Sequence, residues 1–136
     1  MILTVEEVAR GTTILRVQGD VDGETYGALL VQAQQLVSGG TRRLIVDLTR
    51  CDYMSSAGLM TFTAIYKQMR DLNRNQANAS WATRNVLDRA GELGAERELV
   101  LAGPTLEVQR VLDMAGLTAY ISIYPGVAQA LPPTKN

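Results

Sequence analysis

The chain contains no histidine and a single cysteine, Cys51. Without histidine, neither a Ser-His-Asp nor a Cys-His arrangement can form, and a zinc ion would have to rely on carboxylates alone. One cysteine cannot form an internal disulfide, and we expect Cys51 to be a small buried residue rather than a reactive thiol. These absences exclude most hydrolytic chemistries, and we expect neither a metal ion nor a cofactor.

Basic blocks, long apolar runs and phosphate-binding loops are missing as well. The 13 basic and 14 acidic residues are mixed along the chain, which argues against a nucleic-acid partner. No stretch approaches the roughly twenty apolar residues of a membrane span, and no basic and apolar leader opens the sequence. We therefore expect a soluble cytoplasmic protein without membrane insertion. No glycine is followed by the Gly-Lys-Ser/Thr ending of a nucleotide loop.

A Ser-Lys pair is the nucleophilic arrangement that this composition still allows. Lys67 lies on the same predicted helix as Ser56, but about three turns away, about 16 Å along the helix axis. Lys67 therefore cannot act as a base for Ser56. We therefore favour a function without catalysis over that of an enzyme with a serine nucleophile.

Strand and helix patterns alternate along most of the chain. Apolar runs rich in Val, Ile, Leu and Thr predict strands, and apolar residues at helical spacing predict helices. The first two strands flank a turn at Arg10-Gly11, and the later alternation implies parallel pairing through right-handed crossovers. The sequence predicts an α/β fold with a mixed, mostly parallel sheet, an N-terminal hairpin and about four helices. The predicted strands are 3–8, 12–17, 43–48, 98–102 and 120–123, and the predicted helices are 26–38, 56–71, 105–115 and 126–131.

The stretch 72–94 does not follow the alternation. It is mostly polar and aperiodic, so we predict an unusual long connection or insertion that is in part helical. Its single tryptophan, Trp81, either packs against the domain, which is the commoner case, or contacts a partner. The length of the chain predicts a single domain over 1–136, with a short C-terminal tail at 132–136.

The junction between the strand at 43–48 and the next helix is the most informative part of the sequence. The strand is apolar without alternation, as a strand covered on both faces must be. Ser55 and Ser56 fall where the helix begins, and a serine there can cap the helix. The unpaired amides and the helix dipole also favour a phosphate at this point. Asp22 is similarly placed to cap the first helix, or to take part in recognition.

These segments resemble the STAS family, the sulfate transporter and anti-sigma factor antagonist domains, over nearly the whole chain. The resemblance rests on 19–22, on 44–48 leading into 53–59, and on 99–117 with its Gly-Pro turn and closing Ala-Gly-Leu. In the antagonists of this family the junction reads Asp-Ser-Ser/Thr-Gly-Leu. The first of these hydroxyls is phosphorylated by a partner that is both an anti-sigma factor and a serine kinase.

Carried over to this chain, the resemblance implies phosphorylation at Ser56, with Ser55 as the second choice. Gly58 and Leu59 match the motif directly, and Asp22 matches the acidic residue that lies beside the family's phosphorylated serine. The chain departs from the motif at two positions. Ser55 stands where the family has aspartate, and an alanine follows Ser56 where the family has a second hydroxyl.

The function implied is that of a regulatory protein-binding module in bacterial transcription signalling, and not of an enzyme. An anti-sigma factor antagonist of this type binds a kinase of the histidine-kinase-like ATPase type and is switched off by phosphorylation, with a serine phosphatase as a further partner and a homodimer left open. The alternative is a STAS scaffold subunit that is not phosphorylated and docks on a transporter ATPase or a signalling complex. The expected partner-binding residues are Asp22, Ser55, Ser56, Ala57, Gly58, Leu59 and Met60.

Overall fold

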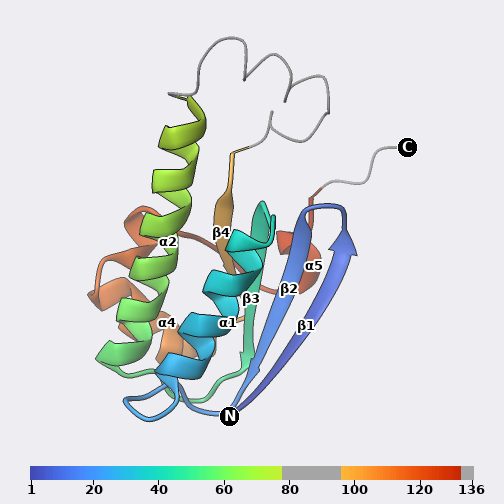
Figure 1. Cartoon of the computed structure of the whole chain (residues 1–136). Helices are drawn as coiled ribbons and strands as arrows, with labels where there is room; N and C mark the ends of the chain where they lie inside the picture. Colours follow the sequence, from blue (N-terminus) through green and yellow to red (C-terminus); the bar gives the residue numbers. More distant parts are fainter. Residues whose placement is uncertain (78–95, 133–136) are drawn as a thin grey trace.

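The computed structural model describes residues 1–77 and 96–132, which form a five-stranded sheet covered by helices (Figure 1). The strand order is β1-β2-β3-β4-β5; β1 is antiparallel to β2, and the other neighbours are parallel. The predicted α/β fold is therefore confirmed. The elements are β1 (Ile2–Ala9), β2 (Thr12–Gln18), α1 (Tyr26–Ser38), β3 (Arg43–Arg50), α2 (Ser56–Ala77), β4 (Glu98–Ala102), α4 (Leu106–Met114), the short 3-10 helix η1 (Leu117–Ala119), β5 (Ser122–Tyr124) and α5 (Val127–Ala130).

Both faces of the central strands are buried, as the unbroken apolar run in β3 predicts. Leu44, Val46 and Leu48 belong to the main core, which lies between the sheet and the helices α1, α2 and α4. Ile45 points to the opposite face, where it belongs to a smaller core with Ala130 of α5. The carboxyl ends of the parallel strands β2 and β3 meet at one edge of the sheet, and the loops that follow them carry the predicted site.

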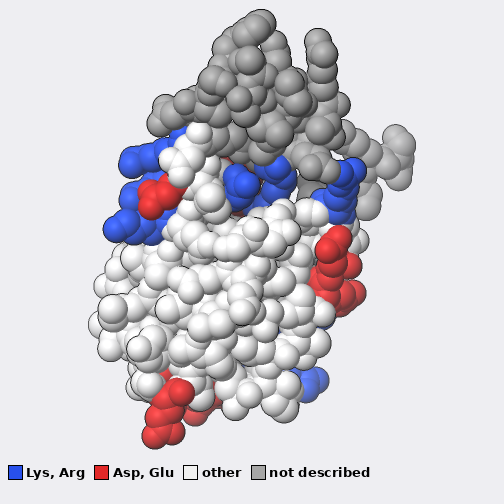
Figure 2. Space-filling model, in the orientation of Figure 1, with Lys and Arg blue, Asp and Glu red and all other residues white. Residues whose placement is uncertain are grey.

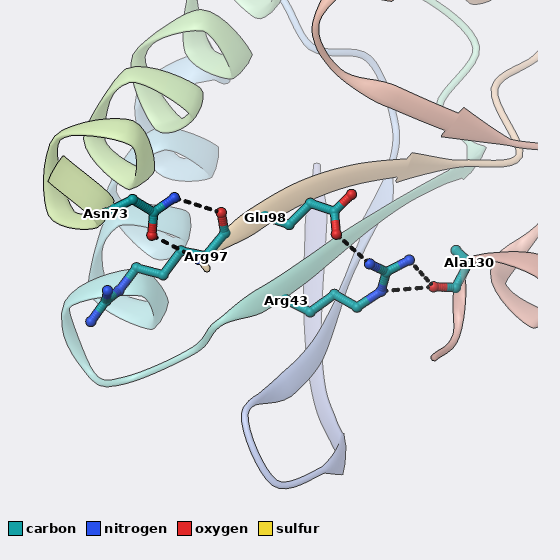
Figure 3. Close-up of polar contacts among 5 residues, drawn as sticks. All are labelled: Arg43, Asn73, Arg97, Glu98 and Ala130. Atoms are coloured by element: carbon teal, nitrogen blue, oxygen red, sulfur yellow. Dashed lines mark hydrogen bonds and ion pairs between the residues drawn. The ribbon is translucent and has the colours of Figure 1, made fainter. Parts of the chain in front are cut away.

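At the opposite edge of the sheet, Arg43, the first residue of β3, forms hydrogen bonds to two other elements. Its Nη1 donates to Oε2 of Glu98 at 2.6 Å, and its Nε and Nη2 donate to the carbonyl oxygen of Ala130 at 3.0 and 2.7 Å (Figure 3). One guanidinium thus joins β3, β4 and α5. This use of all three nitrogens is characteristic of the planar arginine fork.

Helix α2 is longer than the sequence predicts. Residues 73–77 continue the helix although they show no apolar periodicity, so this part of the predicted, partly helical connection is helical. The rest of that connection, Trp81 included, lies outside the described residues.

The last strand is also displaced from its prediction. The strand expected at 120–123 is found at Ser122–Tyr124, and Leu117–Ala119 form a 3-10 turn after Gly116. Gly116 has a φ of 80°, a left-handed conformation that favours glycine, and it ends α4 as predicted. The amides of Tyr120 and Ile121 donate to the carbonyl oxygen of Leu117 at 3.1 and 2.9 Å, so these two residues close the turn and pairing with β4 begins at Ser122.

Candidate functional site

The loops after β2 and β3 are joined by backbone hydrogen bonds beyond the end of the sheet. The amide of Val21 donates to the carbonyl oxygen of Tyr53 at 2.9 Å, and the amide of Ser55 donates to that of Val21 at 2.8 Å. Val21 and Met54 form a parallel bridge, and both side chains are buried. Asp22 and Ser55 follow the two bridge residues, so this pairing brings the two predicted site segments together.

The first turn of α2 rests directly on this bridge. A Cβ atom at Gly58 would lie 2.6 Å from Cγ of Met54 and 2.9 Å from Cγ1 of Val21, far inside van der Waals contact. Gly58 is therefore required by the close approach of the helix to the bridge. The next residue, Leu59, is half-buried and packs against the main core. Gly58 and Leu59 of the motif thus position the start of α2 by packing against the bridge and the main core.

The two serines at the junction have different environments. Ser55 precedes the helix, and its carbonyl oxygen accepts the amide of Leu59 at 3.1 Å, as an N-cap residue does. Its hydroxyl is buried and forms no hydrogen bond, so the predicted side-chain cap is not made by Ser55. Ser56 is the first residue of α2 and is exposed. Of the two hydroxyl-bearing residues, Ser56 is the one that faces solvent.

The carboxylate of Asp22 folds back onto its own loop. Its Oδ1 accepts hydrogen bonds from the amides of Glu24 and Thr25 at 2.9 and 3.1 Å, and from Oγ1 of Thr25 at 3.2 Å. The bond from the amide of Glu24 is the main reason why the pKa of Asp22 lies below its ordinary value. Helix α1 begins at Tyr26 with Thr25 as its N-cap. The amide of Tyr26 donates to the carbonyl oxygen of Asp22 at 2.9 Å, so Asp22 caps the turn that leads directly into α1, one turn before the first residue of the helix.

Exposed apolar side chains accompany Ser56 at this edge of the molecule. Met60, one turn along α2, is 71% exposed, and Tyr53, in the loop before the helix, is 49% exposed. Sequence reasoning identified Met60 but missed Tyr53, although an aromatic residue in a loop of polar neighbours is a usable signal. The charged neighbours in the two loops, Asp20, Glu24 and Asp52, are exposed and acidic.

Cys51 lies at the start of the loop that follows β3. Cys51 is fully buried, its thiol donates to the carbonyl oxygen of Tyr53 at 3.3 Å, and burial raises its pKa, so its predicted structural role is confirmed. Within 1–77 and 96–132, no group of three or more His, Cys, Asp or Glu side chains is placed to hold a metal ion. No helix in these ranges is long and apolar enough to cross a membrane.

The sequence is similar to a known protein family and to a characterised group of bacterial proteins. The sequence profile of the family described as "Mlab, STAS domain" matches residues 5–91, more than half of the chain. A Bordetella bronchiseptica protein, BtrV, described as an anti-sigma factor antagonist, is 29% identical over 125 residues, which cover 92% of this chain and 84% of BtrV.

Solved structures share the fold at lower identity. The crystal structure of an anti-sigma factor antagonist from Mycobacterium paratuberculosis superposes with a TM-score of 0.70 at 21% identity, covering 95% of this chain and 89% of the other. The phosphorylated form of the Bacillus cell fate determinant SpoIIAA gives a TM-score of 0.54 at 16% identity, covering 90% of each chain. The chain belongs to the STAS domain family.

Proposed function

We propose that this protein binds an anti-sigma factor that is also a serine kinase, and that phosphorylation of Ser56 releases the partner. The observation that carries the proposal is the position of Ser56, exposed on the first turn of a helix that Gly58 seats on the Val21–Met54 bridge. The binding surface comprises the exposed side chains of this turn and of the adjoining loops. Ala57 and Met60 lie with Ser56 in the first turns of α2, and the loop that carries Asp22 is joined to Ser55 through the Val21–Met54 bridge.

Ser56 is a better phosphate acceptor than Ser55. A kinase has to bring the hydroxyl into its active site, and the hydroxyl of Ser55 is buried beneath the helix start. A phosphate on Ser56 lies at the N-terminus of a 22-residue helix, where the helix dipole stabilises an anion by about 0.3–1 kcal/mol. The free protein therefore tolerates the modification without unfolding.

The same phosphate is unfavourable in the complex. It brings a charge of about −1.5 to −2 to a surface that already carries Asp20, Asp22 and Asp52. In a close-packed contact with no cation opposite, burying that charge costs several kcal/mol, and each 1.4 kcal/mol is about tenfold in affinity. We expect phosphorylation of Ser56 to raise the dissociation constant of the complex roughly a hundredfold or more. A serine phosphatase restores binding.

The test uses an anti-sigma factor serine kinase from the same organism as the candidate partner. Incubation with that kinase and ATP is expected to add the mass of one phosphate to the wild-type protein and to Ser55→Ala, but none to Ser56→Ala. Absence of phosphate on the wild type, or full modification of Ser56→Ala, would refute the switch.

A scaffold that is never phosphorylated is the second candidate function. It is favoured by one observation, the Ser55 and Ala57 that replace the usual aspartate and second hydroxyl around Ser56. In that case the same surface docks constitutively on a transporter ATPase or a signalling complex. Co-purification with an ATPase, together with no phosphate in the kinase assay, would select this function.

A further inference from the structure

The first strand of the sheet has an unpaired outer edge. β1 pairs with β2 on one side, and no strand within 1–77 and 96–132 pairs with its other side (Figure 1). All of its residues except Leu3 are exposed. A strand in this position presents a row of backbone N–H and C=O groups to solvent, and these groups pair readily with another strand. The occupant that fits this edge is therefore an extended chain.

The other edge of the sheet offers a much shorter strand. β5 has 3 residues, and α5, which follows it, packs Ala130 against the sheet. β1 has 8 residues and contains neither lysine nor proline, two residues that commonly block an exposed edge. Of the two edges, β1 is the one on which a strand can be added.

A β-bulge limits the regular part of β1. Its pairing with β2 is regular from Ile2 to Glu7, and the register shifts between Glu7 and Ala9. A bulge disrupts the regular ladder of hydrogen bonds. The part of β1 that is available to a further strand therefore lies before Val8.

The apolar side chains of this part lie on the face that carries the helices. Leu3 and Val5 are opposite Val17 and Leu15 of β2, which both belong to the main core. Leu3 packs against that core, whereas Val5 is 42% exposed. The main core thus continues to the edge of the molecule as an apolar strip that is only partly covered.

The carboxylates of β1 lie next to each other in its second half. Glu6 and Glu7 are both exposed, and Glu6 forms an ion pair with Arg16 of β2 at 2.7 Å. In the view of Figure 2, acidic side chains gather in one patch at the edge where β1 lies. Like charges directly opposite one another destabilise a strand pair. The position of these two carboxylates therefore limits how a second strand can be placed.

We propose that two copies of this chain pair through β1, antiparallel to each other and about a two-fold axis at Thr4. Residues opposite one another in an antiparallel pair share a face, so the axis passes through a residue of β1. An axis at Glu6 would set two carboxylates opposite each other, and an axis at Val5 would set Leu3 opposite Glu7. With the axis at Thr4, Leu3 lies opposite Val5 of the second copy.

This register makes β1 complementary to itself, which favours a second copy over a different chain. The apolar strips of the two copies meet on the helix face and form one continuous strip, as in the apolar centre of homodimer interfaces. On the other face, Thr4 lies opposite Thr4 of the second copy, a favourable cross-strand pair. Glu6 lies opposite Ile2, and Arg16 of its own chain balances its charge. The two sheets become one sheet with α1 of both copies on the same face.

Cysteine cross-linking of the full-length protein tests the register. Cys51 is fully buried, so an introduced surface cysteine is the accessible thiol of each variant. Thr4→Cys lies on the axis and is expected to form a disulfide-linked dimer on mild oxidation. Glu6→Cys is the matched control, exposed on the same face. It lies four residues from its own copy, about 13 Å along the strand, and is expected not to cross-link.

Sedimentation velocity tests the interface without a cross-link. The wild type is expected to show a monomer–dimer equilibrium that depends on protein concentration. Val5→Glu is expected to raise the dimer dissociation constant at least tenfold, because it brings two carboxylates into the apolar strip. Val31→Glu is the matched control, since Val31 is a 52% exposed valine of α1, and it is expected to leave the equilibrium unchanged.

Three results would overturn the proposal. They are a wild type that stays monomeric at millimolar concentration, a Glu6→Cys variant that cross-links as readily as Thr4→Cys, and a dimer that Val31→Glu dissociates but Val5→Glu does not. The last result would place the contact on α1. Thermal unfolding shows whether each variant retains its fold. The proposal does not depend on the phosphorylation switch, and Ser56→Ala is expected to dimerise as the wild type does.

Discussion

Val21 and Met54 are paired in a parallel bridge that extends the contact between β2 and β3 past the end of the sheet. The bridge has two consequences for the site. It sets Asp22 beside Ser55, and it forms the buried surface on which the first turn of α2 rests. The position of Ser56 therefore depends on a contact between segments more than thirty residues apart in the sequence.

Gly58→Ala tests the close contact between the first turn of α2 and the Val21–Met54 bridge. The added Cβ would lie 2.6 Å from Met54, so the helix start has to move, and we expect a loss of about 1–3 kcal/mol in the free energy of unfolding. Urea denaturation measures the loss. Gly27→Ala is the matched control, because it lies in α1 with nothing within 4 Å of its added Cβ. The control is expected to gain up to about 1 kcal/mol. Equal free energies of unfolding for Gly58→Ala and Gly27→Ala would contradict the close packing of Gly58 on the Val21–Met54 bridge.

Ser55→Ala removes a buried hydroxyl that forms no hydrogen bond. Since an unsatisfied buried hydroxyl is costly, we expect the free energy of unfolding to stay the same or to rise by about 1 kcal/mol. Thr105→Ala is the contrasting variant, because Oγ1 of Thr105 caps α4 by accepting the amide of Val108 at 3.2 Å. It should lose about 1 kcal/mol. A comparable loss in Ser55→Ala would show that its hydroxyl has a partner after all.

Asp22→Asn separates the charge of Asp22 from its hydrogen bonds. Asparagine keeps an oxygen that can accept the amides of Glu24 and Thr25, so the fold is expected to persist. Any weakening of partner binding then reports the lost charge, and isothermal titration measures it. A variant that unfolds at neutral pH would instead show that the loop needs the carboxylate itself.

The lowered pKa of Asp22 predicts a pH dependence with a definite sign. The folded protein binds the proton less tightly than the unfolded chain does, so stability rises with pH across this titration. The contribution is complete above the ordinary aspartate pKa of 3.8 and is lost as the pH falls through the lower folded value. Asp22→Asn should therefore flatten the stability profile below about pH 4. An unchanged profile would contradict the hydrogen bonds of Asp22.

Asn73→Ala removes both hydrogen bonds to the main chain of Arg97. At about 0.5–1.5 kcal/mol each, their loss should lower the free energy of unfolding by about 1–3 kcal/mol. Asn75→Ala is the control, an exposed asparagine on the same helix, with an expected change within about 0.5 kcal/mol. If Asn73→Ala and Asn75→Ala unfold at the same denaturant concentration, the hydrogen bonds between Asn73 and Arg97 contribute nothing to the stability of the fold.

The fold could be predicted because its signals are local. The unbroken apolar run at Leu44–Val46 identifies a strand buried on both faces, and the turn at Arg10-Gly11 identifies the hairpin. The sequence predicts helix in part of 72–94 but not that α2 itself extends to Ala77, because the polar segment has no periodicity and Asn73 is held by its contact with Arg97.

The site could be predicted only in part. Gly58 and Leu59 match a motif, but the reason for the glycine is its contact with Val21, which no sequence pattern reveals. The difference between Ser55 and Ser56 depends on which hydroxyl the bridge buries. Asp22 caps the turn that leads into α1, but its sequence position alone does not show that the regular helix begins only at Tyr26.

The most direct test of the central claim compares the partner's affinity for the two forms of the protein. Isothermal titration of the purified anti-sigma kinase, without ATP, into unmodified protein and into protein phosphorylated at Ser56 measures both dissociation constants. The account predicts a dissociation constant at least roughly a hundredfold larger for the phosphorylated form. Equal dissociation constants would contradict it.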